Sequence, residues 1–225
     1  MASPDQAWAL GQLAPVVQRR TSDEVADRLR DVILSGACPP GEHLRELHLA
    51  ETLGVPRGPV REALLLLESE GLVERRLHRG AVVRAIAPET LEEVFTLRLA
   101  LERVAAEFAA RRRTDEDVER LRRHLEGFRT DTDAQPDVRK DIAFHDEIVG
   151  IARHERLQAA WRGLHSQLRL LIRQVGTYSP EVRYADHERI VDAIADGDPE
   201  RAAEEIEQHI KGAYERALTL LPPPA

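Results

Sequence analysis

Leu53-Gly-Val-Pro-Arg-Gly-Pro-Val-Arg-Glu-Ala-Leu64 combines the features of a tight turn with those of the first turns of a helix. Gly54 suits the end of a preceding helix, because glycine adopts a positive φ at little cost. Pro59 fits the first turn of the next helix, where its missing N–H removes no hydrogen bond. We therefore expect a helix that begins here and has Gly58 as its N-cap.

Two arginines stand at the start of the helix that follows Gly58. Arg57 lies just before it and Arg61 lies on its first turn. The apolar residues fall together on another face and are expected to pack inward: Val60, Ala63, Leu64 and Leu67. Arginine at a helix start forks onto guanine or clamps a phosphate, and only the first use specifies a DNA sequence. The alternative is a pair of ordinary solvated charges, and the residues alone do not assign the two uses.

The flanking segments predict a winged helix-turn-helix. Residues 44–53 form a shorter helix with Leu44, Leu47, Ala50 and Leu53 as its apolar stripe. Upstream, Thr21-Ser-Asp-Glu24 has the spacing of a capping box and opens a first helix, whose apolar face includes Val32. Beyond Gly71 the pattern alternates over residues 72–84, as in a β-hairpin wing.

Charge is unevenly distributed along the chain, whose net charge is −8. Residues 19–87 contain eleven arginines and eleven acidic residues, so the rest of the chain carries the whole acidic excess. Within the predicted wing, Glu74 is followed by arginines alone among the charged residues: Arg75, Arg76, Arg79 and Arg84. A basic strip on an acidic protein confines DNA binding to one face.

Length and composition predict two domains of ordinary soluble character, since the 225 residues are 42% hydrophobic and 32% charged. We expect a flexible extension over residues 1–18, a DNA-binding domain over 19–87 and a helical domain over 88–221. No apolar run reaches the length of a membrane span, and the first residues lack the basic start of a secretory signal. We therefore expect a cytoplasmic protein with no membrane partner. The single cysteine, Cys38, excludes an intrachain disulfide and is expected to be a small packed residue.

The second domain is predicted to be an all-helical antiparallel bundle, which makes the whole chain mainly α. Its first helix is apolar along one side, Leu97 and Val104 included. Six helices are expected, over residues 89–112, 115–129, 136–152, 155–175, 180–196 and 198–220.

One carboxylate and three imidazoles in this bundle form a candidate metal site. Asp141 and His145 lie four residues apart on one helix face, and His187 and His209 lie on the last two helices. Such a mixed nitrogen and oxygen set suits Zn²⁺, Ni²⁺, Mn²⁺ or a similar divalent ion and does not choose among them; we expect Zn²⁺, with Ni²⁺ or Mn²⁺ as alternatives. Chance Asp-x-x-x-His spacing is the competing explanation in a chain with nine histidines.

Arg98 and Glu102 are a polar pair four residues apart on the otherwise apolar first helix of this bundle. A helix-surface salt bridge, which contributes only tenths of a kcal/mol, is one explanation of this pair, and the spacing alone does not decide between it and a functional role.

These motifs together resemble the GntR family of bacterial transcription regulators, in the FadR subfamily with an FCD effector domain. The resemblance rests on residues 53–64, on Asp141-Ile-Ala-Phe-His145 and on the segment from His187 to His209. Six C-terminal helices in place of seven resemble its VanR-like branch.

The resemblance implies roles for particular residues. The DNA-facing set is then Arg57, Gly58, Pro59, Arg61, Arg79 and Gly80. The metal ligands are Asp141, His145, His187 and His209. Arg98, with Glu102 beside it, is implied to line the effector cavity, where a guanidinium pairs with a carboxylate. The chain departs from the family pattern at Pro56 and Gly58, and it has Leu47 where some members place a DNA-contacting arginine, so the operator sequence does not carry over.

The sequence as a whole predicts a homodimeric repressor that is not an enzyme. A small carboxylate bound near the metal is expected to change its affinity for double-stranded operator DNA. A metalloenzyme that activates water at the Asp/His site is one alternative, although no HExxH motif is present. A regulator that senses the metal ion itself is the other.

Overall fold

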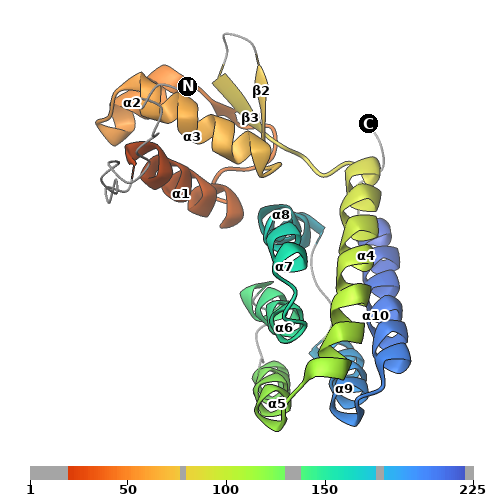
Figure 1. Cartoon of the computed structure of the whole chain (residues 1–225). Helices are drawn as coiled ribbons and strands as arrows, with labels where there is room; N and C mark the ends of the chain where they lie inside the picture. The colour runs from red at the N-terminus through yellow and green to blue at the C-terminus, as the bar shows by residue number, and fades with distance from the viewer. Residues whose placement is uncertain (1–19, 77–79, 130–137, 176–179, 221–225) are drawn as a thin grey trace, which may run out of the picture.

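The computed structural model describes residues 20–76, 80–129, 138–175 and 180–220. It confirms a mainly α protein in which a small winged helix-turn-helix precedes a helical bundle (Figure 1). Two clusters of buried apolar side chains form the cores, one in each part. The predicted extension over residues 1–18 lies outside the described residues.

Three helices build the first part: α1 (Thr21–Leu34), α2 (Glu46–Leu53) and α3 (Arg57–Ser69). The capping box predicted at Thr21 does not form, because the helix already starts there and the N-cap is Arg20, which makes no side-chain cap bond. Val32 and Leu47 were expected on buried faces but are 45% and 56% exposed. Each of these helices buries only some of its apolar residues, and on α2 the only buried residue is Ala50.

The wing is a three-stranded antiparallel sheet with the order β1-β3-β2. The expected hairpin is present as β2 (Val73–Arg76) and β3 (Gly80–Val83). A short strand that the sequence did not predict, β1 (His43–Leu44), pairs with β3. This pairing brings the segment that precedes α2 against the wing.

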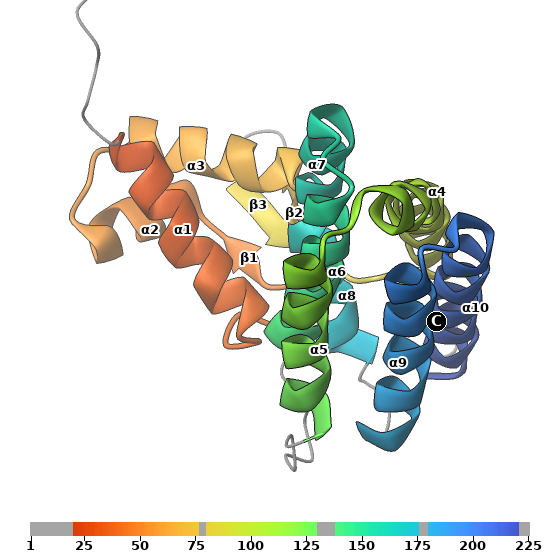
Figure 2. The same cartoon turned by 60° about the horizontal axis from the view of Figure 1, so that its bottom comes forward.

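The bundle consists of α4 (Pro88–Arg112), α5 (Asp115–Arg129), α6 (Val138–Ile151), α7 (Glu155–Arg162), α8 (His165–Val175), α9 (Pro180–Asp196) and α10 (Pro199–Leu220). The long helices α4 and α10 lie side by side in both views (Figures 1 and 2). On α4, Leu97 and Val104 are 48% and 39% exposed, contrary to the expectation of a buried face.

The single helix expected over 155–175 is wrong, because the chain turns at Gly163 and Leu164 and forms α7 and α8 instead. The apolar spacing continues across this break, through Leu157, Trp161, Leu164, Leu168 and Leu171, and so concealed it. The described part of the bundle therefore has seven helices, and the six-helix count behind the VanR-like assignment does not hold.

Cys38 is a buried free thiol, as expected of a small packed residue, and burial raises the pKa of this group. None of the helices in the described ranges combines the length and the apolar character that a bilayer span requires.

Candidate nucleic-acid interface and metal centre

The turn between α2 and α3 holds Arg57 and Arg61 at one surface. Gly54 ends α2 with φ 65°, and the N–H of Val55 then donates to the carbonyl of Ala50 over 3.1 Å. The N-cap of α3 is Pro56 and not Gly58, because Pro56 is the last extended residue (φ −61°, ψ 157°). Gly58 and Pro59 thus lie inside the first helical turn, where no backbone N–H needs a helical partner.

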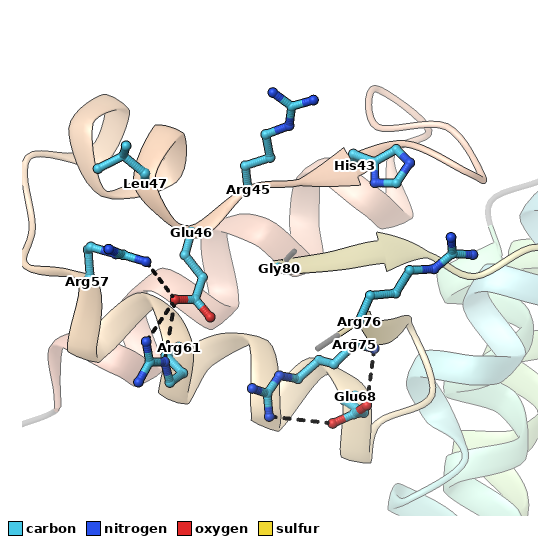
Figure 3. A pocket seen from close by; sticks show the side chains of 10 residues that line it. All are labelled: His43, Arg45, Glu46, Leu47, Arg57, Arg61, Glu68, Arg75, Arg76 and Gly80. Atoms are coloured by element: carbon cyan, nitrogen blue, oxygen red, sulfur yellow. Dashed lines mark hydrogen bonds and ion pairs between the residues drawn. The ribbon is translucent and has the colours of Figure 1, made fainter. Parts of the chain in front are cut away.

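Glu46 at the start of α2 holds both arginines, as Figure 3 shows. Its Oε2 atom lies 3.2 Å from a terminal nitrogen of Arg61 and 3.5 Å from one of Arg57. The hydrogen bond from Arg61, with the charges of both arginines, lowers the pKa of Glu46 despite partial burial. A fixed carboxylate here orients two otherwise exposed guanidinium groups before any ligand arrives.

These arginines line an open hollow of about 980 Å³ between α2, α3 and the wing. Its lining contains five arginines and two glutamates, so its net charge is positive: Arg45, Arg57, Arg61, Arg75, Arg76, Glu46 and Glu68. His43, Leu47 and Gly80 complete it. A basic hollow beside a helix start is the surface that a DNA backbone and groove require.

Gly80 lies in this hollow for a structural reason as well. Its φ is +83°, and a Cβ atom there would approach the backbone oxygen of Leu44 to 2.2 Å. Glycine therefore lets β1 pair closely with β3. Arg79, the other residue predicted at the wing tip, lies outside the described residues.

The sequence did not identify Arg45, His43 or Glu46 as parts of this surface. Arg45 immediately precedes α2, and an arginine before a helix was the signal already used at Arg57. What the spacing could not show is the pairing of β1 with β3, which brings His43 and Arg45 alongside Gly80.

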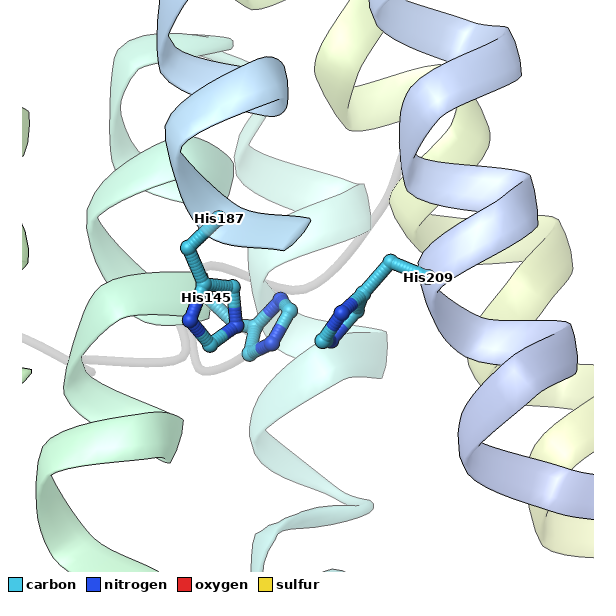
Figure 4. Close-up of side chains that lie close together, drawn as sticks. All are labelled: His145, His187 and His209. Carbon is cyan, nitrogen blue, oxygen red and sulfur yellow. The ribbon is translucent and has the colours of Figure 1, made fainter. Parts of the chain in front are cut away.

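In the bundle, His145 on α6, His187 on α9 and His209 on α10 converge on one point (Figure 4). All three side chains are buried, and one nitrogen atom of each lies within 4.8 Å of the others. The predicted fourth ligand, Asp141, lies one turn before His145. Its Oδ1 atom is 3.6 Å from Nε2 of His187, and its Oδ2 atom is 3.9 Å from Nε2 of His145.

These four side chains fit a divalent ion. Among the described residues, the buried Oδ1 of Asp141 makes no hydrogen bond, which is costly unless something binds it. Burial lowers the pKa of His209 and outweighs the opposing effect of Asp186, so the ring is held neutral, the form that ligates metals. A carboxylate with three neutral imidazoles is the donor set of zinc and similar ions.

Arg98 and Glu102 on α4 belong to the same centre, and they are not the surface pair that their spacing suggested. Glu102 Oε1 accepts from Nε of Arg98 over 2.6 Å, and its Oε2 lies 2.5 Å from Nδ1 of His145. A terminal nitrogen of Arg98 lies 2.8 Å from Nε2 of the same ring. Burial alone raises the pKa of Glu102, but the charge of Arg98, together with the contacts of Arg98 and His145 with the carboxylate, outweighs it and holds the pKa at about 2.

A chain of contacts leads from this centre to the winged domain. Asp146, next to His145, accepts from the indole N–H of Trp161 over 2.5 Å and lies 2.8 Å from Nε2 of His165. His165 begins α8, and Leu170 on that helix is buried in the core of the winged domain. On the same helix, the Ser166 hydroxyl donates to Glu70 at the end of α3 over 2.8 Å.

Comparison with known proteins gives two adjacent family matches. Residues 21–83 match the model of bacterial regulatory proteins of the gntR family, and residues 93–212 match the FCD domain.

The chain is 31% identical over 208 residues to the "Probable D-xylose utilization operon transcriptional repressor" of Paenarthrobacter nicotinovorans, covering 86% of this chain and 88% of that one. It is 34% identical over 176 residues to the gluconate operon transcriptional repressor of Bacillus licheniformis, covering 76% and 72%. Among solved structures, a GntR transcriptional regulator from Rhodococcus sp. RHA1 is similar with a TM-score of 0.75 at 25% identity, covering 89% of this chain and 99% of that one.

Proposed function

The chain belongs to the GntR family of bacterial transcriptional regulators and carries an FCD domain, and on that premise we propose that it is a repressor whose operator affinity depends on a small carboxylate bound beside a divalent metal ion. DNA binding is the function of this family, and the relatives above are regulators and not enzymes. The metalloenzyme alternative is therefore set aside. Repression is supported by the printed names of two relatives.

The observation that carries the proposal is the position of Arg98. The residue is 3% exposed, and its guanidinium group lies against the imidazole of His145 in the histidine cluster. A buried arginine next to a metal centre attracts an anion and recognises a carboxylate through paired hydrogen bonds. A metal ion bound by Asp141 and the three histidines would supply a second positive charge for the same carboxylate.

Binding at this centre has a physical route to the DNA surface. His145 and Asp146 are consecutive on α6, and Asp146 fixes the start of α8 through His165. Because Leu170 anchors α8 in the winged domain, a shift of α6 changes how the two domains pack together. An effector that prefers one packing must alter operator affinity, and the operator must alter effector affinity by the same factor.

We further propose that the protein binds DNA as a homodimer. Two winged helices related by a twofold axis match two half-sites of a palindromic operator. The exposed Leu97 and Val104, two turns apart on α4, support a contact of this helix with a second copy. Sedimentation equilibrium of the full chain should give twice the 25.3 kDa chain mass, and a monomer at micromolar concentration would contradict the proposal.

The experiment that tests the proposed switch begins with a selection of preferred duplexes from random DNA by the full-length protein. Operator affinity is then measured by fluorescence anisotropy with EDTA, with Zn²⁺, and with Zn²⁺ plus small carboxylates. The names of the two relatives suggest sugar acids as the first carboxylates to add. A carboxylate that weakens operator binding in the wild type, but not in Arg98→Ala, supports the proposal. A change produced by Zn²⁺ alone would make the ion the signal, and no change under any condition would refute both switches.

A further inference from the structure

Leu47 is out of place on the surface that faces DNA. It is the second residue of α2, it is 56% exposed, and it lines the basic hollow. The other lining residues are charged or small, apart from His43. Figure 3 places Leu47 on α2, next to Arg45 and above the cluster of Glu46 with Arg57 and Arg61. A large apolar side chain is thus presented to a ligand whose backbone is wholly ionic.

Leu47 has no favourable contact with the phosphate backbone, because phosphates are contacted by hydrogen-bond donors and cations. The major groove offers one apolar group, the C5-methyl of thymine, and an aliphatic side chain discriminates this base by contact with that methyl. Glu46 fixes Arg57 and Arg61 beside Leu47, so a groove read by these arginines brings base edges to the leucine as well.

We propose that Leu47 is a specificity-determining residue of this regulator and contacts the methyl group of a thymine in each operator half-site. The proposal rests on the assignment of the hollow as the DNA-reading surface. If Leu47 makes an apolar contact, the preferred operator contains a thymine at the contacted position. An arginine in place of Leu47 would not select thymine there.

Thymine-to-deoxyuridine substitution tests the contact directly, because it removes the methyl group and leaves base pairing unchanged. Each thymine of the selected operator is replaced in turn, and the affinity of the full chain is measured by anisotropy. We expect one position per half-site at which deoxyuridine weakens binding about fourfold, the scale of one buried methyl or methylene group. Leu47→Ala should weaken binding to the thymine operator by a similar factor. This variant should bind the deoxyuridine operator as tightly as it binds the thymine operator.

Leu65→Ala is the matched control, since Leu65 is an exposed leucine on α3 that does not line the hollow. It should retain the wild-type affinity and the wild-type sensitivity to deoxyuridine. A second variant, Leu47→Arg, should change the selected base at the sensitive position from thymine to guanine and leave the other positions as they were.

Three results would overturn the proposal. The first is that the wild type binds every deoxyuridine duplex as tightly as the thymine duplex. The second is that deoxyuridine at the same position still weakens binding by Leu47→Ala. The third is that Leu47→Arg selects the same sequence as the wild type. Failure of the underlying assignment is distinguishable from these results, because in that case Arg61→Ala, which alters another residue of the hollow, would leave operator affinity unchanged.

Discussion

Replacing Glu102 with glutamine should destabilise the bundle strongly, because it leaves the guanidinium of Arg98 buried without its counter-charge. Glu102 is fully buried, and its carboxylate contacts both Arg98 and His145. A pKa that falls from 4.5 to about 2 on folding corresponds to about 3 kcal/mol of stability at neutral pH. Breaking a buried ion pair by removing one partner costs a similar amount, about 3–5 kcal/mol.

The sign of the pH dependence follows from the lowered pKa. Folding stabilises the charged carboxylate, so the full contribution is present above the unfolded pKa and is lost as the pH falls toward about 2. The difference in unfolding free energy between wild type and Glu102→Gln should therefore be largest at pH 7 and should shrink below about pH 4.5.

Urea denaturation in EDTA, followed by the fluorescence of the buried Trp161, measures this difference. A Trp8→Phe background leaves Trp161 as the only tryptophan. The matched control is Glu107→Gln, which removes a partly exposed i,i+4 partner of Arg111 on the same helix and should cost at most about 0.5 kcal/mol. Equal stabilities of the two variants at pH 7, or an undiminished difference at pH 3, would refute the reasoning.

Four further substitutions test other parts of the structure. Arg61→Ala should weaken operator binding about tenfold to a hundredfold in anisotropy titrations, and unchanged affinity would remove it from the reading surface. Gly80→Ala should lower the stability of the winged domain by at least about 1 kcal/mol, because alanine disfavours the positive φ and its Cβ would meet a backbone oxygen; an unchanged melting temperature would contradict this. His145→Ala should contain less metal than wild type by elemental analysis after loading with Zn²⁺, whereas Asp192→Asn, an exposed control on α9, should match wild type. Leu170→Ala should retain both operator and carboxylate binding while weakening the effect of one on the other, and intact coupling would exclude α8 as the link.

The local part of the winged domain could be predicted from the sequence. Gly54 permits the positive φ that ends α2, Pro59 fixes its own φ, and the apolar spacing of Val60, Ala63 and Leu64 allows only one buried helix face. The error at Gly58 concerned the helix start. Helix boundaries depend on a few dihedral angles, and the extended Pro56 serves as the N-cap without any side-chain bond.

Contacts between distant segments could not be predicted. Glu46 binds two arginines across the helix-turn-helix, and Leu170 belongs to the core of the other domain, although both have unremarkable sequence surroundings. The break between α7 and α8 was missed for the same reason. Gly163 by itself only weakens a helix, and the sequence does not show that Trp161 before the turn and His165 after it both contact Asp146.

The histidine cluster shows how far spacing leads. The Asp141–His145 pair follows from helical geometry, whereas the convergence of His187 and His209 depends on how α9 and α10 pack against α6. Arg98 and Glu102 show the opposite case, since their i,i+4 spacing suggested a surface pair until packing placed them in the interior.

The central claim is that the buried centre and the DNA surface are thermodynamically coupled, and reciprocal titration tests it most directly. Operator affinity is measured by anisotropy with and without the carboxylate found in the screen, and carboxylate affinity is measured by calorimetry with and without operator, in Zn²⁺-loaded protein. The two affinities should change by the same factor. Operator affinity that stays constant as the carboxylate saturates its site would contradict the claim.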